Sequence, residues 1–291
     1  MPRMMIIANY LNEKQPAIER GMKLAQRRGY TVEVVGFCYE SLAAQGITGK
    51  SQQAEARRRI LEAHGQKLEQ LVSAKQLPGL QVSVKSVWEK EIRNWVVRQC
   101  ERRDYAVVVK TGHRSETFVY SSTDWHLLRE CPAPLMIVCD RQWRKTRPLL
   151  ATLDLASRSR VKQALNRKVI ETAKAYAAVM DCELHLIHAI HISPLLTELD
   201  LVDEHSHALD IKESLTPVVE RLCQEYELSP KQFRLKRGPV EKVIASEAAR
   251  LRAQLVVMGT VGRRGVKARL LGNTAEHVLS RLRTDVLAIK P

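Results

Sequence analysis

The sequence predicts an α/β protein of two tandem domains, each with a five-stranded parallel sheet and helices on both faces. Short apolar runs alternate with longer amphipathic segments, and the same order of segments occurs twice. The two halves also align with each other at an offset of about 149 residues. Strands that alternate with helices imply right-handed crossovers between parallel strands. The chain has 291 residues, which is enough for two domains with separate cores.

In the first half, short apolar runs bounded by turn residues are typical of buried parallel strands. They predict strands at Met4–Tyr10, Thr31–Tyr39, Gln81–Trp88, Ala106–Lys110 and Leu135–Cys139. The segments between them have the apolar spacing of helices that bury one face. The predicted helices are Pro16–Arg28, Gln52–Lys75, Ile92–Arg103 and Thr123–Arg129.

The second half repeats this order. Its predicted strands are Leu149–Leu155, Glu183–His191, Phe233–Lys236, Leu255–Met258 and Val286–Lys290. Its predicted helices are Arg160–Met180, Asp203–Tyr226, Val240–Leu251 and Ala275–Arg283. The polar segment Arg141–Pro148 is the natural linker, so we expect domains at residues 1–142 and 147–291.

Three pairs of segments carry the internal alignment. They are Tyr105–Gly112 with Gln254–Val261, Thr123–Leu128 with Thr274–Leu279, and Pro134–Val138 with Asp285–Ile289. A period this long is typical of a duplicated domain rather than of a solenoid. The duplication leaves open whether the repeats pack together as an intramolecular pseudo-dimer, and whether whole chains pair as a homodimer.

A glycine-rich segment follows the apolar run Leu255–Met258. Two residues separate Gly259 from Gly262, and nine residues separate Gly262 from Gly272. Asn273 and Thr274 come next and are candidate caps for the following helix. Glycines let a backbone approach a ligand closely, and the N–H groups at a helix start can bind an anion. The order of strand, glycine loop and helix therefore predicts a phosphate site.

The spacing G-x2-G-x9-G resembles the nucleotide loop of the universal stress protein family. Further segments that carry the resemblance are Thr123–Arg129, Cys131–Pro134, Asp140–Trp143, Leu271–Glu276 and Leu287–Pro291. The family has Ser or Thr after the third glycine, whereas this chain has Asn273. The resemblance covers nearly the whole chain and implies two tandem universal-stress-protein-like, Rossmann-like domains.

The resemblance also implies a cytoplasmic stress-response protein whose C-terminal repeat binds ATP or another adenine nucleotide, as a sensor or regulator. Mg²⁺ is left open as an accompanying ion. Asp154 would bind the ribose or adenine, and the backbone near the adenine would come from Ala189, Met258 and Val261. The phosphates would be bound by Gly259, Gly262, Gly272, Asn273 and Thr274.

The first repeat departs from this pattern. Asn9, Lys110, His113 and Ser121 stand where the second repeat has Asp154, Gly259, Gly262 and Gly272. A side chain at the Lys110 position would obstruct close approach of the backbone to a nucleotide. We therefore expect this repeat not to bind ATP. Two roles are left: binding another anion through Lys110, His113 and Arg114, or serving as a packing partner, which we favour.

Composition narrows the partners and the compartment. The net charge of +15 is shared by both halves, and aromatic residues do not alternate with basic ones, so we do not expect a nucleic-acid partner. The six cysteines have no C-x2-C spacing, which favours reduced thiols in the cytoplasm. We find no apolar stretch long enough to span a membrane and no signal-peptide pattern. Protein partners are not identified by the sequence.

Catalytic motifs are missing from the sequence. It contains no G-x-S-x-G, no G-x-x-x-x-G-K-[ST] and no H-E-x-x-H, which favours binding over turnover. The alternatives are a slow ATP-hydrolysing or nucleotidyl-transfer enzyme, and a scaffold protein with a vestigial loop. His185, His188 and His191 share one predicted strand but not one face. A metal site from Asp203, His191, His205 and His207 is geometrically conceivable. We favour instead histidines that bind no metal and are either solvated or hydrogen bonded in the core.

Overall fold

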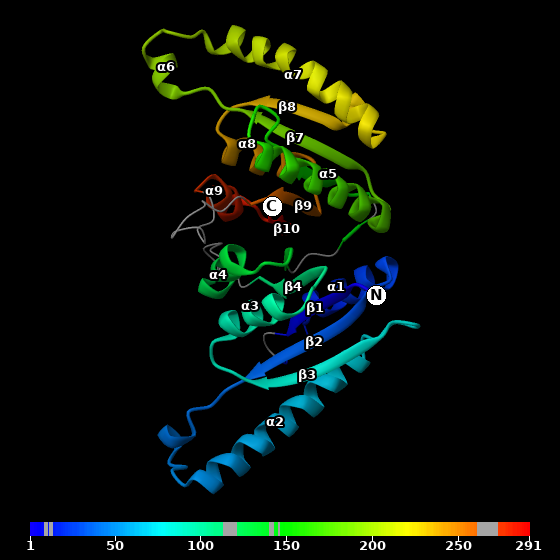
Figure 1. Cartoon of the computed structure of the whole chain (residues 1–291), viewed down its shortest axis with the longest axis vertical. Coiled ribbons are helices and arrows are strands. Elements are labelled where there is room, and N and C mark those ends of the chain that lie inside the picture. Colours follow the sequence, from blue (N-terminus) through cyan, green and yellow to red (C-terminus); the bar gives the residue numbers. More distant parts are fainter. Residues whose placement is uncertain (9–10, 12–13, 113–120, 140–142, 145, 261–272) are drawn as a thin grey trace. The chain divides into compact units, whose positions relative to one another are not determined.

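The computed structural model describes residues 1–8, 11, 14–112, 121–139, 143–144, 146–260 and 273–291 (Figure 1). These residues form two compact units, the first within 1–112 and 121–139 and the second within 143–291. Several residues singled out in the sequence lie outside the described residues: Asn9, His113, Arg114, Val261, Gly262 and Gly272.

The first unit contains five strands and four α-helices in the described residues. The strands are β1 (Arg3–Ala8), β2 (Thr31–Cys38), β3 (Val82–Trp88), β4 (Val107–Thr111) and β5 (Leu135–Val138). The helices are α1 (Pro16–Arg28), α2 (Lys50–Ser73), α3 (Ile92–Arg102) and α4 (Ser122–Glu130), with a short 3-10 helix at Leu42–Gln45. All strand pairs are parallel, in the order β3-β2-β1-β4-β5.

The second unit repeats this arrangement. Its strands are β6 (Leu149–Thr152), β7 (Leu184–Ile190), β8 (Phe233–Arg237), β9 (Leu255–Gly259) and β10 (Asp285–Ile289). Its helices are α5 (Arg160–Met180), α6 (Pro194–Glu198), α7 (Glu204–Tyr226), α8 (Val240–Arg250) and α9 (Asn273–Arg281), with a 3-10 helix at Pro230–Gln232. The parallel order is β8-β7-β6-β9-β10, which matches the first unit strand for strand. The predicted α/β fold with two five-stranded parallel arrangements is therefore confirmed.

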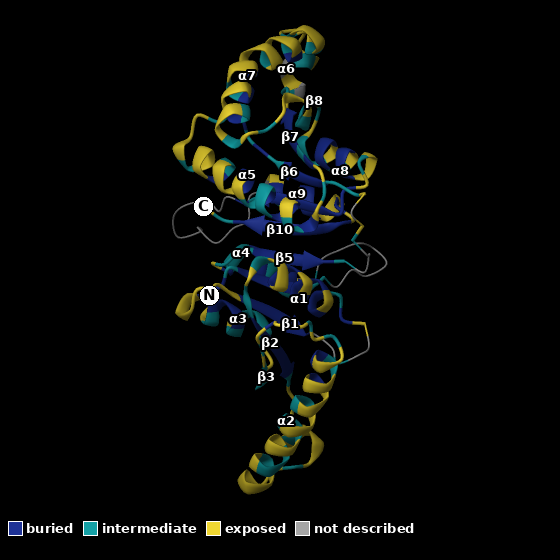
Figure 2. Cartoon of the chain, turned by 90° about the vertical axis from the view of Figure 1, so that its right-hand side faces the viewer, coloured by how far each residue is buried: buried dark blue, intermediate teal, exposed yellow. Residues whose placement is uncertain are grey.

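The strands form the core of each unit, and the helices shield them. Figure 2 shows buried strands between helices whose outer faces are exposed. The strand β1 has five successive buried residues, and β10 is buried along its whole length. A strand buried on both faces requires cover from both sides, which explains the continuous apolar runs in the sequence.

The central strand of each unit determines where a ligand can bind. In the second unit, β6 pairs with β7 on one side and with β9 on the other. The chain runs from β6 to β7 and β8 on one side and then crosses to β9 on the other side of β6. A crevice forms at the carboxyl ends of the strands where the strand order reverses in this way. Thr152, the last residue of β6, lies in register with Met258 on β9.

Several element boundaries differ from the sequence prediction by one to three residues, and two of these differences bear on the site. The strand β6 ends at Thr152 rather than at Leu155, because the backbone of Asp154 bonds to the side chain of Asn166. The helix α9 begins at Asn273, so Asn273 and Thr274 belong to its first turn instead of preceding it. The short helix α6 was not predicted.

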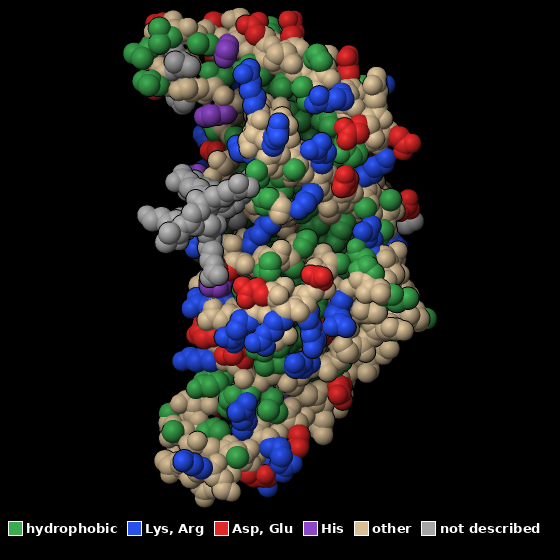
Figure 3. All heavy atoms as spheres, in the orientation of Figure 1, with side chains coloured by type: hydrophobic (Ala, Val, Ile, Leu, Met, Phe, Trp, Pro, Cys, Tyr) green, Lys and Arg blue, Asp and Glu red, His purple; other side chains and the backbone are tan. Residues whose placement is uncertain are grey.

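Two surface properties bear on possible partners. On the face shown in Figure 3, Lys and Arg side chains are interspersed with Asp and Glu side chains over both units. None of the helices within the described residues is long and apolar enough to cross a membrane.

The first unit contains a buried ion pair at the end of β4. Lys110 and Asp124 are 3% and 0% exposed, and Nζ of Lys110 lies 2.6 Å from Oδ1 of Asp124. The lysine also donates to the carbonyl oxygen of Thr111. The other carboxylate oxygen of Asp124 accepts from the backbone N–H and the hydroxyl of Ser121, which completes a capping box at the start of α4. All the charged atoms of this pair are therefore hydrogen bonded.

We expect Lys110→Met to destabilise the first unit by about 3–5 kcal/mol, because the carboxylate of Asp124 would stay buried without its counter-charge. The double variant Lys110→Met, Asp124→Asn removes the charge but keeps an amide that can bond to Ser121, so it should recover part of the loss. Urea unfolding followed by tryptophan fluorescence measures both effects, since Trp88, Trp95 and Trp125 lie in this unit.

The matched control is Lys162→Met in the second unit. Lys162 forms an ion pair of similar length, 2.8 Å to Asp154, but both side chains are nearly half exposed. Its loss should cost less than about 1 kcal/mol. Equal losses in the Lys110 and Lys162 variants would show that burial does not set the strength of the Lys110–Asp124 pair.

Candidate functional site

A cavity of about 760 Å³ lies at the carboxyl ends of β6, β7 and β9. Six segments line it: the residues after β6, the end of β7, the end of β9, and the first halves of α5, α8 and α9, with one further contact from α7. Its apolar lining consists of Leu153, Ala156, Leu165, Ala189, Ile190, Ile211, Val240, Ile244, Met258, Gly259, Ala275 and Val278. Its polar lining consists of Thr152, Asp154, Lys162, Asn166, His188, His191 and Thr274.

Asp154 is held at the mouth of the cavity by two residues of α5. Its backbone N–H donates to Oδ1 of Asn166 at 3.0 Å, and its carbonyl oxygen accepts from Nδ2 of Asn166 at 2.9 Å. Lys162 donates to the carboxylate at 2.8 Å. The amide pair fixes the backbone, whereas the exposed ion pair contributes little stability. The carboxylate is therefore well positioned and can exchange its partner easily.

The absence of a side chain at Gly259 has a packing reason. A Cβ atom there would lie 2.6 Å from Cδ2 of Leu165 and 2.7 Å from its Cγ, both far inside van der Waals contact. The glycine thus lets α5 approach the end of β9. The sequence pattern attributed this glycine to approach of a ligand, and it could not indicate the contact with Leu165.

His188 is buried in the wall of the cavity, with 6% of its surface exposed. Its Nδ1 lies 3.2 Å from the carbonyl oxygen of Leu153 and 3.4 Å from the backbone nitrogen of Leu155, so the tautomer decides which bond forms. Burial lowers the pKa of His188 below its ordinary value, and the nearby Leu153 carbonyl and Asp154 only partly oppose this. The imidazole is therefore neutral at pH 7.

The structure brings together five of the residues predicted to bind a nucleotide. Asp154, Ala189, Met258, Gly259 and Thr274 all line this cavity. Asn273 begins α9 next to them. The other three, Val261, Gly262 and Gly272, lie outside the described residues. The first turn of α9 has backbone N–H groups without partners inside the helix, which suits an anion.

The lining residues that were not predicted from the sequence include Lys162, Leu165, Asn166 and His188. Lys162 and Asn166 follow Asp154 by eight and twelve residues, and they reach it only because α5 folds back over the end of β6. The spacing of Lys162, Leu165 and Asn166 places them on one helix face. The sequence shows that these three residues share a face, but the same spacing occurs in any amphipathic helix and does not indicate a ligand site.

The first unit fills the corresponding space with its own side chains. In the internal alignment, Lys110 matches Gly259 and Asp124 matches Ala275, so two small residues of the second unit are replaced by the buried ion pair. The positive charge of Lys110 is neutralised by Asp124 at 2.6 Å. Of the two roles considered for this repeat, this pairing argues against binding an anion through Lys110.

Metal binding was considered for the histidine-rich segment after β7. Within the described residues, no three or more His, Cys, Asp or Glu side chains are grouped so that they could hold a metal ion. The set of His191, Asp203, His205 and His207 is described and is not gathered in this way. Asp203 instead caps α7, where its carboxylate accepts from the N–H of Ser206 at 2.8 Å.

The lowered pKa of His188 predicts how stability depends on pH. An unfolded histidine titrates near pH 6.5, whereas the buried one titrates lower. Below about pH 6.5 the unfolded chain therefore binds a proton that the folded chain excludes, and stability is lost as the pH falls. His188→Asn keeps a side-chain donor for Leu153 but cannot titrate. Between pH 7.5 and 5.5, the variant should lose less stability than the wild type, by up to about 1.4 kcal/mol per pH unit.

Thermal or urea unfolding at a series of pH values measures this difference in slope. The exposed His277 on α9 provides the control, because His277→Asn removes an imidazole from the surface. Identical slopes for the wild type and His188→Asn would contradict the argument, whatever the absolute stabilities.

Comparison with known proteins supports one family for the whole chain. The sequence profile of the Universal stress protein family matches residues 2–138 and 162–290. Universal stress protein E of Escherichia coli (strain K12) is 29% identical over 298 aligned residues, which cover 99% of this chain and 93% of the relative. The Universal stress protein E homolog of Haemophilus influenzae is 27% identical and is matched over 99% of this chain and 96% of its own.

Solved structures share the fold at low sequence identity. A putative universal stress protein from Pseudomonas aeruginosa UCBPP-PA14 superposes with a TM-score of 0.74 at 22% identity, covering 99% of this chain and 93% of that one. A universal stress protein from Archaeoglobus fulgidus superposes with a TM-score of 0.62 at 17% identity, covering 98% of both chains. The match of the family profile to both repeats identifies this chain as a tandem-domain member of the universal stress protein family.

Proposed function

We propose that the second repeat binds ATP or a related adenine nucleotide and that the protein acts as a nucleotide-dependent regulator in a stress response. The observation that carries this proposal is the gathering of Asp154, Ala189, Met258, Gly259 and Thr274 around one cavity. Its volume of about 760 Å³ lies within the range of small-molecule sites. It also lies at the switch point of a parallel sheet, where ligands of such folds bind.

The apolar part of the cavity suits a planar base. Ile190, Ile244, Met258 and Val278 contribute aliphatic and thioether groups from β7, α8, β9 and α9. The small side chain of Ala189 leaves the end of β7 accessible, so backbone groups there can pair with the edge of an adenine. The neutral imidazole of His188 adds no charge to this wall.

The polar part suits a ribose and its phosphates. The carboxylate of Asp154 can accept from ribose hydroxyls, because among the described residues its one bonded partner is the exposed ammonium of Lys162. The start of α9 presents backbone N–H groups at the positive end of the helix dipole. Lys162 can exchange Asp154 for a phosphate oxygen without a large cost, since its ion pair is half exposed.

These groups support binding rather than turnover. In the proposed complex the carboxylate of Asp154 bonds to the ribose, and His188 is bonded to the backbone near Leu153. Among the described residues of the cavity, these two therefore supply no base for a water at the phosphates. Interactions that stabilise substrate and transition state equally do not accelerate a reaction. A regulator uses such binding to shift the population of one conformation or complex. The cytoplasm is the compartment that we propose for this role.

Calorimetry with ATP should detect about one site per chain. Asp154→Ala should weaken ATP binding by about 1–3 kcal/mol, because a charged hydrogen-bond acceptor would be lost. Asp154→Asn should lose less than Asp154→Ala, since an amide oxygen still accepts. Gly262→Lys, in the glycine loop, should abolish binding. The control Asp210→Ala removes an exposed carboxylate of α7 and should leave the affinity unchanged.

Measurements of turnover separate the proposal from its alternatives. Hydrolysis of ATP by the wild type should stay far below the ~10 per second of a median enzyme. A rate near that value that is lost in Gly262→Lys would show that the protein is an enzyme and that the proposed regulatory function is wrong. Failure of ATP, ADP and AMP to bind would favour a scaffold protein with a vestigial loop.

A further inference from the structure

A second cavity lies at the opposite edge of the sheet in the second unit. Its volume is about 520 Å³, and it is formed by Trp143 and Arg147, by the second half of α8 with the turn that follows, and by the segment from Arg281 to Asp285. We call it the arginine groove. It lies where β9 and β10 begin, whereas the proposed nucleotide cavity lies where β9 ends. The five residues of β9 separate the two by about 13 Å at 3.3 Å per residue.

Four arginines line the arginine groove: Arg147, Arg252, Arg281 and Arg283. The guanidinium groups of Arg147, Arg252 and Arg281 form no hydrogen bond or ion pair with any described residue. A smaller depression continues the groove and adds Lys242. The positive charge of these three side chains is therefore concentrated around a cavity and is not neutralised by a described residue.

The single carboxylate among the described lining residues does not offset this charge at the surface. Asp285 is 2% exposed, and its Oδ2 accepts from Nε1 of Trp143 at 2.7 Å. It is thus turned inward and used to hold the segment before β6. Glu247, a buried acid on α8, does not line the groove. Its Oε2 accepts a hydrogen bond from Arg250 at 2.7 Å.

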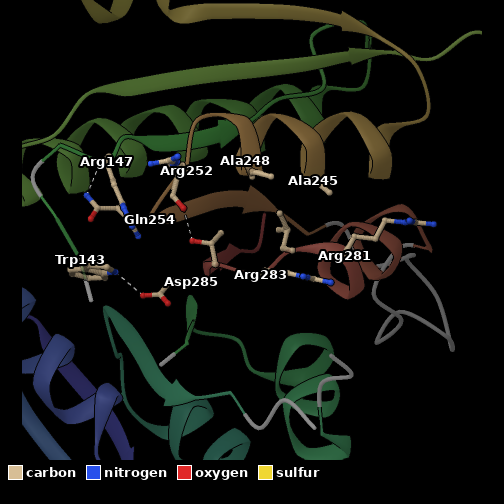
Figure 4. A pocket seen from close by; sticks show the side chains of 13 residues that line it. Trp143, Arg147, Ala245, Ala248, Arg252, Gln254, Arg281, Arg283 and Asp285 are labelled. Carbon is tan, nitrogen blue, oxygen red and sulfur yellow. Dashed lines mark hydrogen bonds between the residues drawn. The ribbon is translucent and has the colours of Figure 1, made fainter. Parts of the chain in front are cut away.

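Hydrogen bonds fix the wall of the arginine groove in advance. Gln254 is 5% exposed; its Oε1 accepts from the N–H of Arg144 at 2.8 Å, and its Nε2 donates to the carbonyl oxygen of Arg147 at 2.7 Å. The hydroxyl of Thr284 donates to the carbonyl oxygen of Ala253 at 2.7 Å. Figure 4 shows Gln254 beside Arg147. A wall that is already ordered loses little entropy when a ligand binds.

A role in helix stability accounts for only part of this arrangement. Arg281 lies in the last turn of α9 and Arg252 just after α8, where cations stabilise the helix dipole. Arg147 comes from neither helix, because it belongs to the segment before β6. Arg252 also adopts a φ of +52°, a region that favours glycine, so an arginine there carries a conformational cost.

The chemistry of the lining identifies the class of ligand. Guanidinium groups recognise phosphate through paired hydrogen bonds. In Figure 4, Arg147 and Arg252 lie towards one end of the arginine groove, Arg281 and Arg283 lie towards the other end below Ala245, and Ala248 lies between the two pairs. Small apolar side chains leave room for the body of a molecule between two charged ends. We propose that the arginine groove binds a small molecule that carries two phosphate groups.

Calorimetry with fructose 1,6-bisphosphate as the probe tests this proposal, with fructose 6-phosphate and sulfate as the comparison anions. The bisphosphate should bind with one site per chain, about tenfold or more tightly than fructose 6-phosphate. Arg252→Gly should weaken binding at least about tenfold while the melting temperature stays the same or rises, because glycine tolerates the positive φ. A purely structural role for Arg252 would lower the melting temperature instead.

Further variants distinguish binding in the arginine groove from non-specific attraction of anions to a basic protein. Ala249 is exposed on the wall of the groove, so Ala249→Phe should block binding without changing any charge. Arg221→Ala, on the exposed face of α7, removes one charge elsewhere and should have no effect. Asp154→Ala should also leave bisphosphate binding intact, which distinguishes this site from the proposed nucleotide site.

Three outcomes would overturn the proposal. They are no binding of the bisphosphate at about 1 mM, equal weakening by Arg221→Ala and Arg252→Gly, and wild-type affinity in Ala249→Phe. Equal affinities for sulfate, fructose 6-phosphate and the bisphosphate would reduce the groove to a site for an adventitious ion only.

Discussion

The pairing of β6 with both β7 and β9 is the constraint on which the second unit depends. Because all these strands are parallel, their carboxyl ends lie at one edge. The chain builds β7 and β8 on one side of β6 and then crosses over to build β9 on the other side. That reversal separates the connections and leaves a cavity between them. The polar residues that follow the strands, Asp154 and His191, lie at this cavity because of the topology alone.

The two repeats use the same backbone arrangement and fill the same position in opposite ways. The second repeat has Gly259, against which Leu165 packs, and Ala275, and both residues line the cavity. The first repeat has Lys110 and Asp124, which neutralise each other at 2.6 Å in the interior. Either charge alone would be unfavourable in that environment, so both residues must be present together. This dependence explains how a duplicated domain can keep its fold while it loses the shape of a site.

Much of the fold could be predicted from periodicity, because parallel strands give continuous apolar runs and the helices between them bury one face. The limits of α1 and α5 were predicted without error for this reason. Contacts between distant side chains could not be predicted in the same way. Asn166 ends β6 early by bonding to Asp154, and nothing in the local sequence of β6 indicates that interruption.

The candidate site shows the same division. A motif within one continuous stretch of chain could be located in the sequence. Gly259, at the end of β9, and Thr274, at the start of α9, belong to such a stretch. Residues that enter from another element, such as Lys162 or His188, could not, because a lysine or histidine in a helix or strand has many ordinary roles. The arginine groove escaped prediction for a further reason: its arginines come from three separate segments, and each is unremarkable where it stands.

The direction of α8 and α9 relates the two cavities of the second unit. Both helices begin beside the strand-end cavity, at Val240 and near Thr274, and both end beside the arginine groove, near Ala249 and at Arg281. A helix start offers unpaired N–H groups and a partial positive charge, so the first cavity can bind phosphate largely through backbone. A helix end offers carbonyl groups and a partial negative charge, which repel phosphate. An anion can bind at the second cavity only if side-chain cations outweigh those carbonyls. The proposed binding of phosphate at both cavities would therefore explain their difference in composition, since the first has a glycine, alanines and a helix start and the second has four arginines.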